Sequence, residues 1–160
     1  MYDRASPWRR VASPTLPHLP VKKLLQLDFL PRSADLALLL LRIYYGLALF
    51  LLHGKGKLEA FSTMRTTFYD PLGVGNGTSY FLALIGEVVF PVLIVLGLFT
   101  RLAALGSTFG LSVAFFLIHK GQLSGPTSGE LACLYVGAFL ALFIAGGGRF
   151  SLDARMGSRS

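Results

Sequence analysis

The sequence predicts an all-α integral membrane protein: a four-helix bundle that follows a basic, proline-rich amino-terminal arm and a short interfacial helix. Its 160 residues are 53% hydrophobic and only 14% charged, with a mean hydropathy of +0.61, which is too apolar for an ordinary soluble domain. The apolar residues also gather in four runs, each close to the ~20 residues that a helix needs to cross a bilayer. These runs do not alternate as β-barrel strands would, so helices are favoured.

The four expected spans are joined by polar or glycine-rich connections. A very tight join at Thr100 and Arg101 separates the second span from the third. The GVGNG sequence at 73–77 has no preceding strand and no following Lys-Ser or Lys-Thr, so we expect a flexible turn that leads into the second span and not a phosphate-binding loop. The expected spans are 34–53, 80–99, about 102–118 and about 130–145.

Residues 1–33 differ in composition from the rest. Prolines and arginines dominate 1–20, which predicts an extended arm, whereas 21–30 (VKKLLQLDFL) is amphipathic and is expected to lie along the membrane surface. No small-residue cleavage site follows the first apolar run, so we expect an uncleaved amino terminus. The predicted organisation is an arm with an interfacial segment at 1–33, a transmembrane bundle at 34–146 and a cytoplasmic tail at 147–160.

The net charge of +7 points to charged membrane flanks and not to nucleic acid, and we predict no nucleic-acid partner. On the predicted topology both termini share one side with ten basic residues, against four on the other, so both termini should be cytoplasmic, most simply in a bacterial inner membrane. The ten are Arg4, Arg9, Arg10, Lys22, Lys23, Arg32, Arg101, Arg149, Arg155 and Arg159, and the four are Lys55, Lys57, Arg65 and Lys120.

Two charged residues fall inside predicted spans, where charge is expensive and normally faces the bundle interior with a partner. Arg42 lies about 12 Å from the cytoplasmic end of the first span, and Glu87 lies about 18 Å from that side on the second. An arginine side chain can bridge the difference, so the sequence predicts an Arg42–Glu87 pair. Such a pair either fixes a ligand pocket or only registers two helices.

Further polar residues are expected in the outer half of the bundle. Tyr45, Gly46, Leu49 and His53 share one helix face with Arg42, and Lys57 continues that face if the helix extends. His119 and Glu130 fall at the outer ends of the third and fourth spans. The candidate ligand-binding residues are therefore Arg42, His53, Lys57, Glu87, His119 and Glu130.

A quinone fits this set, because its carbonyl oxygens need donors such as His, Lys or Arg and its ring suits neighbours such as Tyr44 and Tyr45. A metal held by imidazoles and carboxylates is a weaker alternative, since no short ligand spacing such as HxxxH is present. Haem between His53 and His119 is weaker still. The single cysteine, Cys133, excludes an intrachain disulfide and is expected to be a packing residue.

Several of these residues stand in short motifs: Arg42 with Gly46, HGKGKL at 53–58, Glu87, GLFTRLAAL at 97–105, His119 and GGGRFSLD at 146–153. Their order and spacing resemble the DoxX-like family of small four-helix membrane proteins over about residues 35–155. The resemblance implies a four-helix bundle associated with redox systems, including thiosulfate oxidation coupled to quinone and oxidoreductase complexes at the membrane. It does not imply one activity.

The basic arm and the long outer loop depart from the family pattern and favour an accessory subunit, with the arm binding anionic lipid or docking on a larger complex. The leading hypothesis is a subunit of a membrane redox complex with a quinone-like ligand site. The alternative is a purely structural subunit whose polar residues serve helix registration. A transporter is disfavoured because four short spans give no inverted repeat.

Overall fold

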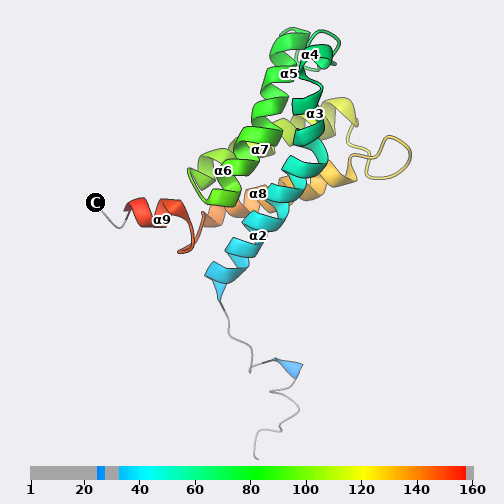
Figure 1. Cartoon of the computed structure of the whole chain (residues 1–160). Helices are drawn as coiled ribbons and strands as arrows, with labels where there is room; N and C mark the ends of the chain where they lie inside the picture. Colours follow the sequence, from blue (N-terminus) through cyan, green and yellow to red (C-terminus); the bar gives the residue numbers. More distant parts are fainter. Residues whose placement is uncertain (1–24, 28–32, 158–160) are drawn as a thin grey trace, which may run out of the picture. The chain divides into compact units, whose positions relative to one another are not determined.

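The computed structural model describes residues 25–27 and 33–157, and the chain divides into two units at the boundary between Arg32 and Ser33. Apart from residues 25–27 and Ser33, the predicted arm and interfacial helix at 1–33 lie outside the described residues and stay predictions. Everything that follows concerns the second unit (Figure 1).

The second unit is helical, as predicted. Within the described residues, three helices are long and apolar enough to cross a membrane, and a fourth apolar helix has 16 residues. The first helix, Ala34–Glu59, consists of α2 (Ala34–Leu49), η1 (Phe50–Gly54) and α3 (Lys55–Glu59). The second consists of α5 (Asn76–Leu84), η2 (Ile85–Val89) and α6 (Phe90–Leu96). The third consists of α7 (Thr100–Val113) and η3 (Ala114–Ile118), and the fourth is α8 (Glu130–Ala145). Short helices α4 (Phe61–Met64) and α9 (Leu152–Gly157) complete the described elements.

The helix boundaries follow local chemistry. Ser33 caps α2, since its hydroxyl accepts the Leu36 N–H at 3.2 Å. The first helix runs six residues beyond the predicted end at His53, so Lys57 lies on the same continuous helix. The join between the second and third helices is Gly97–Phe99 and not Thr100–Arg101, because α6 ends on Gly97 in the left-handed region (φ 71°) and α7 already begins at Thr100.

Each element labelled η is a five-residue π-helical segment: η1 and η2 lie inside the first and second helices, and η3 forms the end of the third. Such segments widen the helix by one residue per turn, leave backbone carbonyls without their ordinary partners and occur often at functional sites. The segments η1 and η2 contact each other, so the first two helices meet where both are locally distorted.

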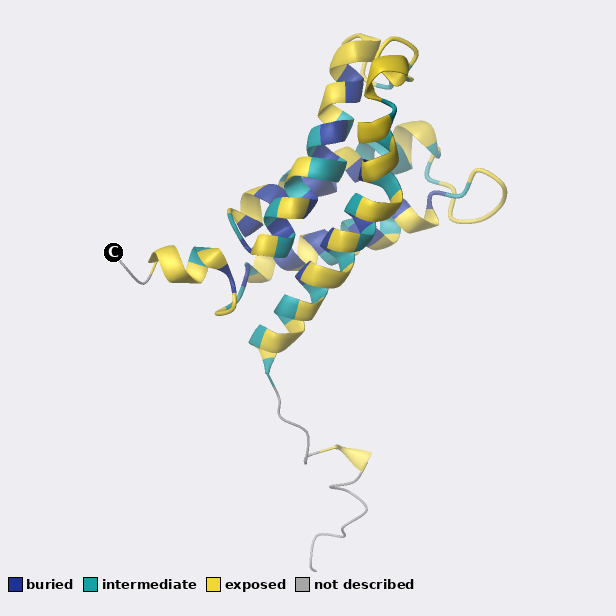
Figure 2. Cartoon of the chain, in the orientation of Figure 1, coloured by how far each residue is buried: buried dark blue, intermediate teal, exposed yellow. Residues whose placement is uncertain are grey.

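The bundle has a thin buried core and a broad apolar exterior, which Figure 2 shows as mostly exposed outer helix faces. The α7–α8 pair packs most extensively, and α2 lies against α6 and α8. The exposed surface includes large apolar side chains on every long helix, a pattern that requires an apolar solvent such as lipid. The core residues are Leu49, Ile94, Ala103, Ala104, Leu111, Ala132, Tyr135, Phe139 and Leu142.

Candidate functional site

The predicted Arg42–Glu87 pair is wrong. Arg42 is fully buried, but its guanidinium donates to the backbone of α6 and of the carboxy-terminal segment: to the carbonyls of Ile94 and Val95 at 3.5 Å each and to that of Phe150 at 3.1 Å. Ile94 and Val95 belong to the last turn of α6, and the Ile94 carbonyl also accepts the Gly97 N–H at 3.0 Å, whereas Phe150 precedes α9. The arginine therefore closes the end of the bundle that carries Gly97, away from Glu87.

The same end is held by Asp153. Its carboxylate accepts the N–H groups of Phe99 at 2.7 Å and Thr100 at 2.8 Å, so it caps the amino end of α7 from a residue more than fifty positions away. In return the Asp153 N–H donates to the Gly97 carbonyl at 2.9 Å. The LFTR turn at 98–101 and the RFSLD segment at 149–153, which are far apart in the sequence, are thus held together by these hydrogen bonds.

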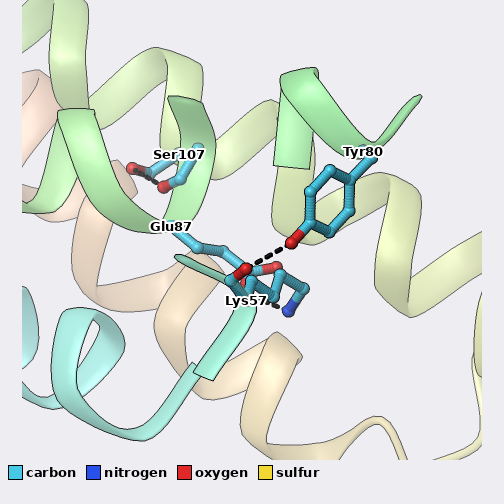
Figure 3. Close-up of polar contacts among 5 residues, drawn as sticks. Lys57, Tyr80, Glu87 and Ser107 are labelled. Atoms are coloured by element: carbon cyan, nitrogen blue, oxygen red, sulfur yellow. Dashed lines mark hydrogen bonds and ion pairs between the residues drawn. The ribbon is translucent and has the colours of Figure 1, made fainter. Parts of the chain in front are cut away.

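Glu87 pairs instead with Lys57, whose Nζ lies 2.5 Å from Oε2 of the carboxylate. Both side chains are largely buried, with 22% and 18% of their surfaces exposed. Figure 3 shows the two side chains meeting between the first and second helices, with the Tyr80 hydroxyl donating to the Lys57 carbonyl. The charge of Glu87 is therefore compensated at short range by a residue that the sequence analysis also selected.

The backbone around Glu87 is distorted because of Pro91. The Phe90 N–H bonds to the Ile85 carbonyl, one residue beyond the α-helical partner, so the Gly86 carbonyl loses its usual donor. The next possible donor is Pro91, which has no N–H. The hydroxyl of Ser107 on α7 takes that place, donating to the Gly86 carbonyl at 3.0 Å (Figure 3).

A cavity of about 340 Å³ lies between the second and third helices, directly beside this distortion. Its wall is mostly apolar and aromatic, and Glu87, Ser79 and Ser107 are its polar side chains. Known small-molecule sites have a similar size and composition, with a few polar groups that fix the orientation of the ligand. The lining residues also include Phe68, Leu72, Phe90, Gly106, Phe109 and Gly110.

The remaining predicted residues lie elsewhere. The ring of His53 packs edge-on against Tyr135, with centroids 5.9 Å apart, and Nδ1 of His119 lies 3.0 Å from the Thr127 carbonyl. Glu130 is exposed at the start of α8. None of these three side chains, nor Arg42, lines the cavity. In the described part of the chain, no group of three or more His, Cys, Asp or Glu side chains is placed to hold a metal ion.

The structure therefore brings together two of the six candidates, Lys57 and Glu87, and adds Ser79, Tyr80 and Ser107, which sequence reasoning missed. Pro91 could have indicated a role for Ser107. Because proline has no N–H, helix carbonyls near Glu87, four residues earlier, lack their usual hydrogen-bond donor, and a hydroxyl on a neighbouring helix can supply one. No comparable signal marks Ser79 or Tyr80.

Long apolar helices with exposed apolar faces and a buried ion pair define the class: a small helical integral membrane protein. The chain belongs to the DoxX family, whose family model matches residues 37–120. Two proteins of Haemophilus influenzae (strain Rd), each described as an uncharacterized protein, are similar to it. One is 36% identical over 114 residues, which is 66% of this chain and 80% of the relative, and the other is 35% identical over 77 residues, 47% and 51% respectively. No solved structure matches this chain.

Proposed function

We propose that this protein binds a small, largely apolar molecule of the quinone type in the cavity between its second and third helices, as an accessory subunit of a membrane redox complex. The observation that carries the proposal is the position of Glu87: a carboxylate in a membrane-spanning helix that forms part of the wall of an apolar cavity. Intramembrane charges are expensive and are kept mainly where they serve a site.

The size of the cavity supports a head-group ligand. At about 340 Å³ it stands at the lower end of the ~300–1,000 Å³ typical of small-molecule sites. One substituted ring fills such a volume, whereas a long isoprenoid tail does not fit inside it and would extend into lipid. The aromatic residues Phe68, Phe90 and Phe109 of the wall suit a flat ring.

Filling the cavity tests the proposal without disturbing Glu87. A Cβ atom at Gly110, which lines the cavity on α7, would meet no other atom within 4 Å, so Gly110→Leu adds a side chain at the cavity wall without a backbone clash. The matched control is Gly137→Leu on α8, where a Cβ is equally free and the residue does not line the cavity. Both variants should elute and unfold like the native protein.

The native protein and the Gly137→Leu variant, purified in mild detergent and titrated with decylubiquinone and its reduced form, should take up one molecule per chain. Uptake should fall to background in Gly110→Leu. Equal uptake by Gly110→Leu and the native protein would contradict the proposal. Metal or haem as ligand is disfavoured by the side chains of the wall, which include no histidine or cysteine.

The proposal that this protein is a subunit of a membrane redox complex is tested separately. Extraction in mild detergent should return the protein in a fixed ratio with larger redox proteins, and deletion of residues 1–30 should release it, if the arm is the docking element. A structural subunit without its own ligand is the alternative; it predicts the same copurification but no ligand uptake by the native protein.

A further inference from the structure

The hydrogen bonds that the cavity wall already makes limit which quinone-type ligands it can bind. The inference drawn from them rests on the proposed function above. The cavity has three polar side chains: Glu87, Ser79 and Ser107. What each can offer a ligand depends on the hydrogen bonds that it already makes, because a hydroxyl has one proton to donate and a carboxylate has none.

Both hydroxyl protons are already used. The Ser79 hydroxyl donates to Oδ1 of Asp70 at 2.6 Å, and the Ser107 hydroxyl donates to the Gly86 carbonyl at 3.0 Å. Neither bond is easily given up. Asp70 lies in the loop that it organises through further bonds to the Val74 and Gly75 N–H groups, and the Gly86 carbonyl has lost its helical donor. Each serine therefore keeps only acceptor capacity on the cavity side.

Glu87 adds a third acceptor. Its Oε2 receives the Lys57 ammonium, whereas Oε1 takes part in no hydrogen bond within the described residues. A carboxylate that forms an ion pair has no proton to donate, so Oε1 can only accept. Lys57, whose ammonium group could donate, does not line the cavity.

We infer that the cavity selects an apolar ligand that donates hydrogen bonds, namely a hydroxyl-bearing ring such as a quinol or an alkylphenol, over the corresponding carbonyl or ether compound. This reverses the preference that the sequence suggested, where His, Lys and Arg donors were expected to face quinone carbonyls. An acceptor-only wall leaves a carbonyl ligand unpaired against three oxygen atoms, and unpaired polar groups in a dry site weaken binding.

The test uses two probes that differ only in the donor: 4-hexylphenol and its methyl ether, 4-hexylanisole. Each is titrated against the full-length protein in lipid nanodiscs, with the Gly110→Leu protein in identical nanodiscs as the correction for partition into lipid. The phenol should saturate at one molecule per chain, and the ether should bind at least about tenfold more weakly, as expected when a buried acceptor loses its donor.

A second variant checks the atom responsible. Glu87→Gln replaces the acceptor-only carboxylate by an amide that also donates, so the preference for the phenol should shrink to less than about threefold. Glu59→Gln makes the same change on an exposed residue of α3 and should leave the preference as in the native protein. The native-protein comparison of the two probes does not depend on how well Glu87→Gln folds.

The outcomes separate the two proposals. Saturable binding of neither probe above the Gly110→Leu background would overturn the cavity as a ligand site, and this inference with it. Saturable binding of both probes with equal affinity, or tighter binding of the ether, would overturn the donor preference alone and leave the cavity as a ligand site.

Discussion

The α-carbon of Gly54 packs closely against the backbone of Glu87. A Cβ atom at position 54 would lie 2.9 Å from the Glu87 carbonyl carbon and would overlap the Glu87 carbonyl oxygen. This contact joins the π-helical segments η1 and η2 and fixes the distance between the first two helices. One turn further along, Lys57 reaches the Glu87 side chain. The HGKGKL motif therefore combines a close backbone approach with the ion pair that this approach permits.

Gly54→Ala should separate the two helices and destabilise the protein by roughly 1–3 kcal/mol, since the added methyl group meets backbone that cannot rotate away. Gly56→Ala is the matched control on the same helix, because a Cβ there meets nothing within 4 Å. It should be neutral or stabilising by up to about 1 kcal/mol. Unfolding midpoints in detergent measure both, and equal midpoints for the two variants would refute the role of Gly54.

Removing the hydroxyl groups of two adjacent residues on α7 should have different effects on the stability of the protein. Ser107→Ala leaves the Gly86 carbonyl without a donor and should destabilise by about 1–3 kcal/mol. Thr108 is also buried, but its hydroxyl has no partner among the described residues, so Thr108→Val should be neutral or stabilising. The comparison is made by reversible unfolding under identical detergent conditions. Stability unchanged in Ser107→Ala would show that the Gly86 carbonyl is satisfied in another way.

Asp153 should act as a cap for a helix that it does not precede in sequence. Asp153→Ala removes the acceptor for the Phe99 and Thr100 N–H groups and should cost about 1–2 kcal/mol of stability, with faster amide hydrogen exchange in the first turn of α7. Glu59→Ala, which breaks only an exposed pair with Lys55, should change stability by less than about 0.5 kcal/mol. Unaltered exchange at Thr100 in Asp153→Ala would contradict the capping role.

The loop before α5 should loosen in acid. Hydrogen bonds from the Ser79 hydroxyl and from the backbone N–H groups of Gly75 and Val74 lower the pKa of Asp70 below its ordinary value. A carboxyl whose pKa is lowered by folding stabilises fully above the unfolded-state pKa of about 3.9 and loses that contribution as the pH falls through the folded-state value. Thermal midpoints measured between pH 6 and pH 3 should therefore fall more steeply for the native protein than for Asp70→Asn. An identical acid slope in both would contradict this account.

The proposed orientation, with both termini cytoplasmic, is checked by cysteine labelling in whole cells after replacement of Cys133 by alanine. Cysteine introduced by Asn76→Cys, at the start of α5, should react with a membrane-impermeant maleimide from outside. Cysteine introduced by Arg155→Cys, in α9, should react only after the membrane is permeabilised. The reverse pattern would overturn the orientation that the distribution of basic residues predicts.

Sequence reasoning located the helices well because a span is set by length and apolarity, which are local properties. It selected Lys57 and Glu87 because charge inside a span is rare and visible in the sequence. It paired Glu87 with the wrong cation, since both Arg42 and Lys57 lie on the first helix and reach depends on where the two helices touch. Gly54 sets that contact, and its effect depends on the backbone of a different helix.

The sequence by itself thus determined that this protein lies in a lipid bilayer and has four apolar helices. It also identified the few polar side chains whose burial in the bilayer is energetically unfavourable. Only the tertiary structure decided that Arg42 and Asp153 close one end, that Ser107 completes a helix distorted by Pro91, and that the cavity beside Glu87 presents acceptors alone. The physical reason is that hydrogen bonds and close approaches are properties of pairs of atoms. Their partners here lie twenty to more than a hundred residues apart, a separation that no local pattern encodes.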